Sequence, residues 1–268
     1  MSVDYAAITA RQQKVWSLGD YGKIGSLLSW LGEHLVRELD VHAGERVLDV
    51  AAGNGNASLP AARRFADVLA TDYVPELLEE AQRRADADGV VLRTQVADAQ
   101  ALPFDDASFD VVMSTIGAMF APDQDAVAAE MLRVCRSGGR IGMANWTPDS
   151  QVGDMFRAVS RFVPPPQGVR PAVAWGDEER VRELLGPGCS SLRIERQTCA
   201  FRFPSTQAVV DYFRTWYGPT AAAFSAVGED GRQALEDALA AAFDAHNTAT
   251  DGTFASDVAY LEVVGVRA

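Results

Sequence analysis

Five short apolar runs alternate with helical segments between residues 46 and 146, and this alternation constrains the fold more than any other feature. The runs are continuously apolar, which is typical of strands covered on both faces. Strands that alternate with helices build βαβ units and a mostly parallel sheet. The expected strands are residues 46–51, 67–72, 90–98, 109–114 and 139–146.

Two of the intervening helices have recognisable ends. Pro75 begins the segment 75–87 at a position where its missing N–H costs nothing. Apolar residues recur there at helical spacing and predict one buried face. A second helix is expected over 123–136, ended by the "SGG" at 137–139.

Two regions outside these units differ in character. The first 45 residues hold an apolar helical stretch at 24–39, and we expect 1–45 to form a helical cap. Residues 204–257 are rich in alanine and are expected to be a helical lid, inserted between the strand-like runs 191–203 and 260–267. The core would then comprise 46–203 with 258–268. The prolines of 163–176 remove donors and predict a loop.

The composition restricts the ligands. Of 268 residues 48% are apolar and 23% charged, which is ordinary for a globular protein. No run of about 18 uncharged apolar residues and no secretory leader is present, so we expect a cytoplasmic protein without membrane insertion. A formal charge of −13 disfavours nucleic acid. Three scattered cysteines without a histidine cluster indicate neither a disulfide framework nor a metal site.

The stretch "LDVAAGNGN" at 48–56 is a buried strand that ends in an acid and runs into a glycine turn. Dinucleotides and S-adenosylmethionine are both bound by turns of this kind. A dinucleotide turn needs a third glycine where this chain has Ser58. The charge of Asp49 also suits a cationic ligand better than a pyrophosphate.

With Asp49, Gly53 and Gly55 in this arrangement, residues 44–146 resemble class I S-adenosylmethionine-dependent methyltransferases. More narrowly, the chain is similar to small-molecule enzymes of the ubiquinone and menaquinone methyltransferase type. The resemblance implies an α/β fold, with a Rossmann-like doubly wound sheet of seven strands. That sheet would be mostly parallel with an antiparallel last strand, and a helical cap would cover it. Asn56 departs from the family, in which many members have a third glycine.

The resemblance also assigns site residues. Asp72 would accept hydrogen bonds from both ribose hydroxyls, Asp98 and Ala99 would bind the adenine, and Tyr73 would cover its face. A carbonyl near Ser114 would take the ammonium group, and the aromatic rings of Trp16 and Tyr21 would close over the sulfonium. The complete expected cofactor set is Trp16, Tyr21, Asp49, Ala51, Gly53, Gly55, Asn56, Asp72, Tyr73, Asp98, Ala99 and Ser114.

An apolar substrate chamber is indicated by aromatic residues after strand ends and in the second half of the chain. Its expected residues are Phe120, Trp146, Phe156, Trp216 and Tyr217. His246 is the one candidate general base. For each of these residues, ordinary packing is the alternative interpretation.

These features predict transfer of a methyl group from S-adenosylmethionine to a small, mostly apolar molecule such as a secondary metabolite, by in-line displacement. Positioning alone supplies much of the rate of such a reaction. Two alternatives stay open. In the first, the protein binds S-adenosylmethionine without transferring a methyl group and acts as a cyclase or a partner protein. In the second, it is a NAD-type oxidoreductase. The sequence leaves a homodimer open.

Overall fold

The computed structural model describes residues 3–268, in which seven strands form one sheet of order β3-β2-β1-β4-β5-β7-β6. The strands are β1 (Arg46–Val50), β2 (Asp67–Asp72), β3 (Arg93–Val96), β4 (Phe109–Thr115), β5 (Cys135–Trp146), β6 (Cys189–Phe203) and β7 (Phe254–Arg267). The first five are parallel, and β7 is antiparallel to both β5 and β6. The expected sheet with an antiparallel last strand is confirmed.

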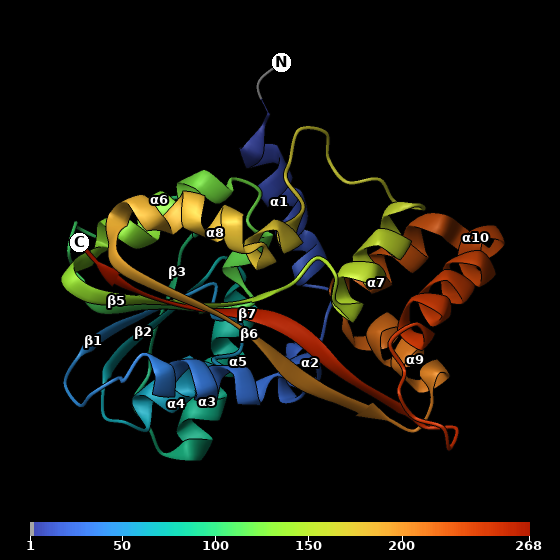
Figure 1. Cartoon of the computed structure of the whole chain (residues 1–268), viewed down its shortest axis with the longest axis horizontal. Helices are drawn as coiled ribbons and strands as arrows, with labels where there is room; N and C mark the ends of the chain where they lie inside the picture. Colours follow the sequence, from blue (N-terminus) through green and yellow to red (C-terminus); the bar gives the residue numbers. More distant parts are fainter. Residues whose placement is uncertain (1–2) are drawn as a thin grey trace.

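Helices cover both faces of this sheet, as Figure 1 shows. On one face lie α3 (Ser29–Glu38), α4 (Ser58–Ala62) and α5 (Pro75–Asp88). On the other lie α6 (Gln124–Val134) and α8 (Glu178–Leu185). Double coverage explains why β1 and β2 are buried at every position after the first, since neither of their faces meets water there.

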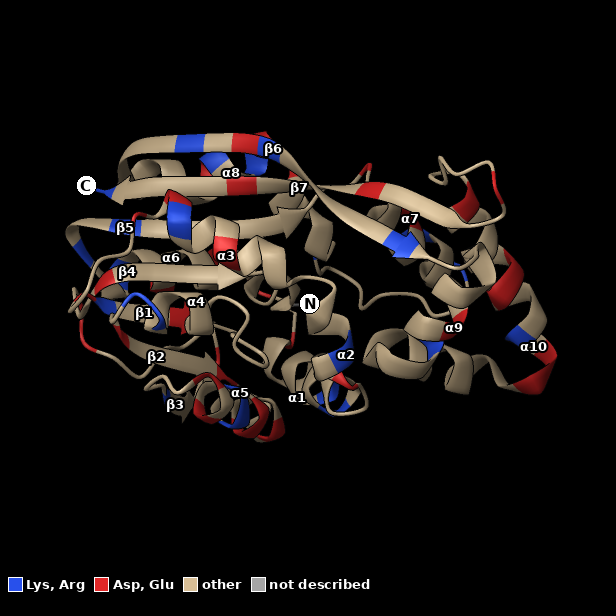
Figure 2. Cartoon of the chain, turned by 90° about the horizontal axis from the view of Figure 1, so that it is seen from below, with Lys and Arg blue, Asp and Glu red and all other residues tan. Residues whose placement is uncertain are grey.

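A separate group of helices lies beyond one end of the sheet, where β6 and β7 extend past the other strands (Figures 1 and 2). It contains α7 (Gln151–Ser160), α9 (Thr206–Trp216) and α10 (Gly218–Asp244), and α10 bends at Gly228. Apolar side chains of these helices belong to the same buried cluster as β5 and β7. The helical group is therefore joined to the sheet by a continuous core.

The amino-terminal region is broken into more helices than the sequence predicted. It forms α1 (Tyr5–Trp16), α2 (Tyr21–Ser26) and α3, so the helical stretch expected at 24–39 is divided between two helices. Asp20 caps α2 by accepting from the Lys23 N–H. The chain then turns at Leu27 and Leu28, which line the main cavity.

The boundary between α6 and β5 also differs from the prediction. The helix ends at Val134, and "SGG" lies inside β5 instead of terminating the helix. Cys135 pairs with Phe109, after which regular pairing resumes only at Arg140 opposite Val111. The glycines therefore form a β-bulge, and Gly138 takes the positive φ of 71° that this irregularity needs.

Candidate functional site

A deep cavity opens at the carboxyl ends of β1, β2, β4 and β5, beneath α1 and α2 and beside α7 and α9. It encloses about 1080 Å³, its open mouth included. Its position is where open α/β sheets bind their ligands.

The glycine turn after β1 forms one wall of the cavity. Gly53 and Gly55 have φ angles of 55° and 86°, which favour glycine, and Ala51 adopts a strained φ of 52°. Gly53 and Ala51 line the cavity, whereas Gly55 packs toward Ala81 of α5. The two glycines therefore have different roles, one facing the ligand space and one facing the helix.

Asp49 lies beneath this turn and is buried with 1% exposure. Its Oδ2 accepts from the Ser58 hydroxyl at 2.6 Å, and its Oδ1 has no hydrogen-bond partner. Burial raises the pKa of Asp49 to about 7, against the lowering effect of Ser58. Ser58 stands where a dinucleotide turn has its third glycine, and its hydroxyl supplies a hydrogen bond to one oxygen of the buried Asp49 carboxyl.

Asp72 lines the cavity at the end of β2. Its Oδ2 accepts from the Gly53 N–H at 3.0 Å and its Oδ1 from the Val74 N–H at 2.9 Å. Burial raises the pKa of this carboxyl to about 6, although the backbone donors lower it. Each oxygen retains a lone pair for hydroxyl groups of a ligand.

Two asparagines attach α2 to the glycine turn. The Asn54 side-chain amide donates to the Tyr21 carbonyl at 2.6 Å, and that of Asn56 donates to the Gly25 carbonyl at 2.9 Å. The Asn56 Oδ1 accepts from Arg84 of α5 at 2.9 Å. Asn56 therefore links α2 and α5 through the turn, which gives a structural reason for its departure from glycine.

The loop after β3 connects the cavity to α1. Ala99 lines the cavity, while the Asp98 carboxylate accepts from the main-chain and side-chain nitrogens of Gln100. The Gln100 amide also donates to the Thr9 hydroxyl of α1 at 3.0 Å. Asp98 thus organises a loop whose next residue faces the cavity.

The end of β4 reaches the cavity through Thr115, Ile116 and Gly117. Ile116 has a φ of 66°, which is costly for a β-branched side chain. A Cβ on Gly117 would lie 1.9 Å from the Ala51 carbonyl oxygen, so only glycine fits there. The predicted Ser114 is buried below, where its hydroxyl donates to the Val50 carbonyl at 2.7 Å.

Aromatic rings from distant segments meet around the mouth. The Trp16 ring centroid lies 4.6 Å from that of Phe120, 5.5 Å from Tyr21 and 5.7 Å from Tyr217. Burial raises the pKa of the Tyr21 hydroxyl far above its usual range, and this hydroxyl has no hydrogen-bond partner. All four residues line the cavity, and the faces of aromatic rings attract cations.

The cavity suits S-adenosylmethionine better than a dinucleotide. Among the described lining residues there is no Lys or Arg for a pyrophosphate, and Asp72 is the one charged side chain. Buried carboxyls at the glycine turn would repel phosphate and tolerate a cation. The unpartnered oxygen of Asp49 and the free lone pairs of Asp72 add to that preference.

Comparisons with known proteins agree with this geometry. A family described as a methyltransferase domain matches residues 47–139. A demethylmenaquinone methyltransferase of Deinococcus radiodurans is 34% identical over 128 residues, covering 46% of this chain and 53% of that protein. The chain belongs to the class I S-adenosylmethionine-dependent methyltransferases. Its cofactor is S-adenosylmethionine.

Two further proteins are similar to this methyltransferase over a larger share of the chain. An uncharacterized protein of Mycobacterium tuberculosis is 44% identical over 232 residues, which cover 85% of each chain. The solved structure of the YcgJ protein from Bacillus subtilis has a TM-score of 0.62 at 19% identity and covers 88% of this chain and 97% of that chain. The second likeness concerns the fold alone.

Most of the predicted site residues of the methyltransferase come together at this one cavity. Those that line it are Trp16, Tyr21, Ala51, Gly53, Asn56, Asp72, Tyr73, Ala99, Phe120, Trp146 and Tyr217. Those that do not are Asp49, Gly55, Asp98, Ser114, Phe156, Trp216 and His246. Asp49, Gly55, Asp98 and Ser114 support the lining residues from behind.

The remaining three predicted residues lie further out. Phe156 packs against Phe120 and lines a second, shallower groove. Trp216 is half-buried, and the Lys23 ammonium lies 5.9 Å from its ring. The His246 Nε2 lies 2.6 Å from a carboxylate oxygen of Asp154, so this imidazole is held outside the cavity.

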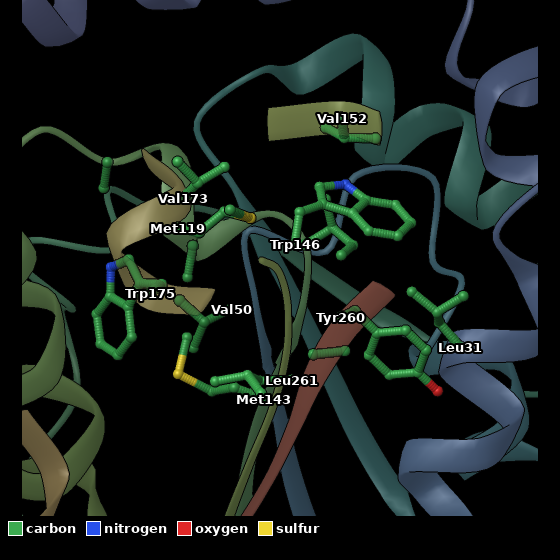
Figure 3. Packing of buried hydrophobic residues seen from close by; sticks show 14 of the residues in the cluster. Leu31, Val50, Met119, Met143, Trp146, Val152, Val173, Trp175, Tyr260 and Leu261 are labelled. Carbon is green, nitrogen blue, oxygen red and sulfur yellow. The ribbon is translucent and has the colours of Figure 1, made fainter. Parts of the chain in front are cut away.

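Sequence reasoning missed several lining residues from the second half of the chain and from α2. They are Ile24, Gly25, Val152, Met155 and Phe201. Figure 3 shows the Trp146 ring beside Val152 of α7. These residues are ordinary apolar positions of amphipathic helices and a strand, and only their packing brings them to the cavity.

Within residues 3–268 no helix combines the length and apolar composition that a membrane span needs. Within the same residues no three His, Cys, Asp or Glu side chains are grouped to hold a metal ion.

Proposed function

We propose that this methyltransferase acts on a small, mostly apolar acceptor molecule. The observation that carries the proposal is the composition of the cavity beyond the glycine turn. Its walls there are formed by β5, α7, β6 and α9 through Trp146, Met155, Phe201 and Phe213. Burying an apolar surface against them favours binding by about 25 cal/mol per Å². A charged acceptor would lose its hydration without gaining a partner.

In the proposed arrangement Asp72 binds the ribose hydroxyls of the cofactor. Tyr73 and Ala99 border the adenine, whereas Ala51 and Gly53 border the methionine end. The support is that all five residues line one continuous cavity. Asp49 and Asp98 are proposed to act indirectly, because both hold the segments that carry the lining residues.

The cofactor supplies a methyl group on a positively charged sulfur, which is a good leaving group. The chain then has to orient the acceptor in line with that bond and exclude water. Among the described lining residues there is no histidine and no second carboxylate that would act as a base. The acceptor is therefore proposed to be a neutral amine, or a hydroxyl or carbon acid that has already lost its proton when it binds, because none of these needs a protein base for the transfer.

We propose that the amino-terminal helices and α9 with α10 act as a cap and a lid. Gln12 of α1 donates to the Phe120 carbonyl at 3.0 Å, and Gln13 donates to the Tyr73 carbonyl. Along α1 no residue is fully buried, so these few polar contacts and Trp16 hold it over the mouth. Such a helix can open at low cost to admit ligands.

The test combines a binding measurement with a product measurement. S-adenosylhomocysteine is titrated calorimetrically into the wild type and Asp72→Asn, which keeps the side chain's shape. Charged hydrogen bonds contribute about 1.5–3 kcal/mol, so the affinity should fall at least about tenfold. Asp67→Asn, at the exposed start of the same strand, is the matched control and should bind as the wild type does.

The product measurement incubates labelled S-adenosylmethionine with phenols, amines, quinones and polyketide-like acceptors and detects one added methyl by mass. Transfer to apolar members and not to charged ones is expected. Unchanged affinity of Asp72→Asn would contradict the assignment of the site. Tight cofactor binding without methylation of any acceptor would favour a cyclase or a partner protein, and preference for charged acceptors would refute the proposed substrate class.

A further inference from the structure

A second groove adjoins the cavity and is left unexplained by cofactor binding. It lies between α7, the loop that follows α7, and the start of α10, and encloses about 490 Å³ with its open side. Val159, Val163, Pro165 and Pro219 contribute apolar surface to it. Val163 is 37% exposed.

The groove and the cavity share two residues, Met155 and Tyr217. These two residues therefore lie between the spaces, and we call them the partition. Next to them Phe120 of the cavity meets Phe156 of the groove, with ring centroids 5.9 Å apart. The two spaces are neighbours separated by one layer of side chains.

Helix α7 provides a continuous apolar path through this partition. Val152 lines the cavity, Met155 lines both spaces and Val159 lines the groove. Residues at this spacing lie along one helix face. The seven-residue step corresponds to about 10 Å along the helix axis, which is the length of a short hydrocarbon chain.

The partition contains a side chain that can move. Methionine is unbranched, has three rotatable bonds and fills irregular space. A change in the Met155 rotamers would open a passage beside Tyr217 without moving the backbone. Among the described residues that line the groove none is charged, and Ser160, Tyr217 and Thr220 are the polar ones in a lining that is otherwise apolar.

We propose that the groove binds a linear apolar chain of the acceptor, whose reacting head lies in the main cavity. The substrate class is then an amphiphilic molecule with a compact head and a hydrocarbon tail, and it is not a compact ring system alone. The inference rests on the proposed methyl transfer for the place of the head. What argues for this occupant is that the two apolar spaces share Met155 and Tyr217 as lining residues and lie along one apolar face of α7.

The experiment measures binding of 4-n-alkylphenols, from ethyl to decyl, by titration calorimetry on the full chain saturated with S-adenosylhomocysteine. Each methylene that enters the groove should raise the affinity about threefold to fourfold. Val159→Trp fills the groove, and Val163→Glu places a charge at its exposed side. Both should abolish the gain for long chains and leave ethylphenol binding unchanged. Arg161→Trp, at an exposed position just after α7, is the matched control and should keep the full dependence.

Equal dependence on chain length in the wild type and in both groove variants would overturn the inference. The inference would also be overturned if the affinity of the wild type for alkylphenols did not rise with chain length beyond ethylphenol. A variant that binds S-adenosylhomocysteine with wild-type affinity is folded. If Val159→Trp does not fold, Val163→Glu, which alters a surface position, still tests the groove. The alkylphenol series is also measured without S-adenosylhomocysteine. If the wild type does not bind S-adenosylhomocysteine, the proposed function is refuted, and the alkylphenol series still tests the groove.

Discussion

Asp49→Asn should stabilise the ligand-free protein at alkaline pH and lose that advantage in mild acid. Burial raises the pKa of the Asp49 carboxyl to about 7, from the ordinary value of 3.8 for an aspartate in water. A carboxyl whose pKa is raised in the folded state favours folding below the unfolded pKa, and this contribution is lost as pH rises through the folded pKa. An asparagine does not titrate.

The magnitude follows from the two pKa values of Asp49, 3.8 unfolded and about 7 folded. Ionisation lowers the free energy of unfolding by about 2 kcal/mol at pH 5.5 and about 4 kcal/mol at pH 8.5. An asparagine Nδ2 in place of the unpartnered Oδ1 costs about 1–3 kcal/mol at either pH. The difference between the variant and the wild type should therefore grow by about 2 kcal/mol between these pH values.

Urea denaturation at pH 5.5 and 8.5, with equal m-values in both proteins, measures this difference. The Ser58 hydroxyl can still donate to the asparagine Oδ1, so the fold should be preserved. Asp67→Asn, which alters an exposed acid, should shift the stability equally at both pH values. A difference for Asp49→Asn that is independent of pH, or that favours the wild type more at pH 8.5, would refute the electrostatic account.

Three further changes probe the site and its surroundings. Asn56→Ala removes the hydrogen bonds to the Gly25 carbonyl and to α5. It should therefore lower the free energy of unfolding by about 1–3 kcal/mol and weaken S-adenosylhomocysteine binding in calorimetry. Unchanged binding would show that α2 is held by other contacts. His246→Gln should leave the methyl-transfer rate within about twofold, because the imidazole faces Asp154, and a loss of about 100-fold or more, as for a general base, would contradict this. Trp146→Ala should cost about 3–5 kcal/mol in urea denaturation and broaden the acceptors methylated toward bulkier ones, and an unaltered acceptor profile would show that Trp146 does not border the acceptor.

Local pattern predicted the central strands well because their apolar runs are short and end in acids. The strand expected over 90–98 is shorter in the structure, as β3 covers only Arg93–Val96. This edge strand is exposed at every position, so burial does not reinforce the pattern there. Helices α1, α7 and α8 were not singled out, although α7 has an apolar face at Val152, Met155 and Val159.

The candidate site divides in the same way. Gly53, Asp72 and Ala99 follow strand ends, and parallel strands deliver their carboxyl ends to one edge of the sheet. His246 and Trp216 were chosen for residue type alone, and neither lines the cavity. A residue type indicates what a side chain can do, while its distance from the ligand depends on the whole fold.

The sequence by itself determined the order of strands and helices, the glycine turn and the acids that select the cofactor. These depend on periodicity and on spacing within about 50 residues, which the chain carries locally. Only the tertiary structure decided the acceptor side: that Val152, Phe201 and Phe213 share a wall, and that Asn56 ties α2 to α5. Contacts between segments so distant in the chain arise from packing of the common core, and no local pattern encodes which apolar residues will meet.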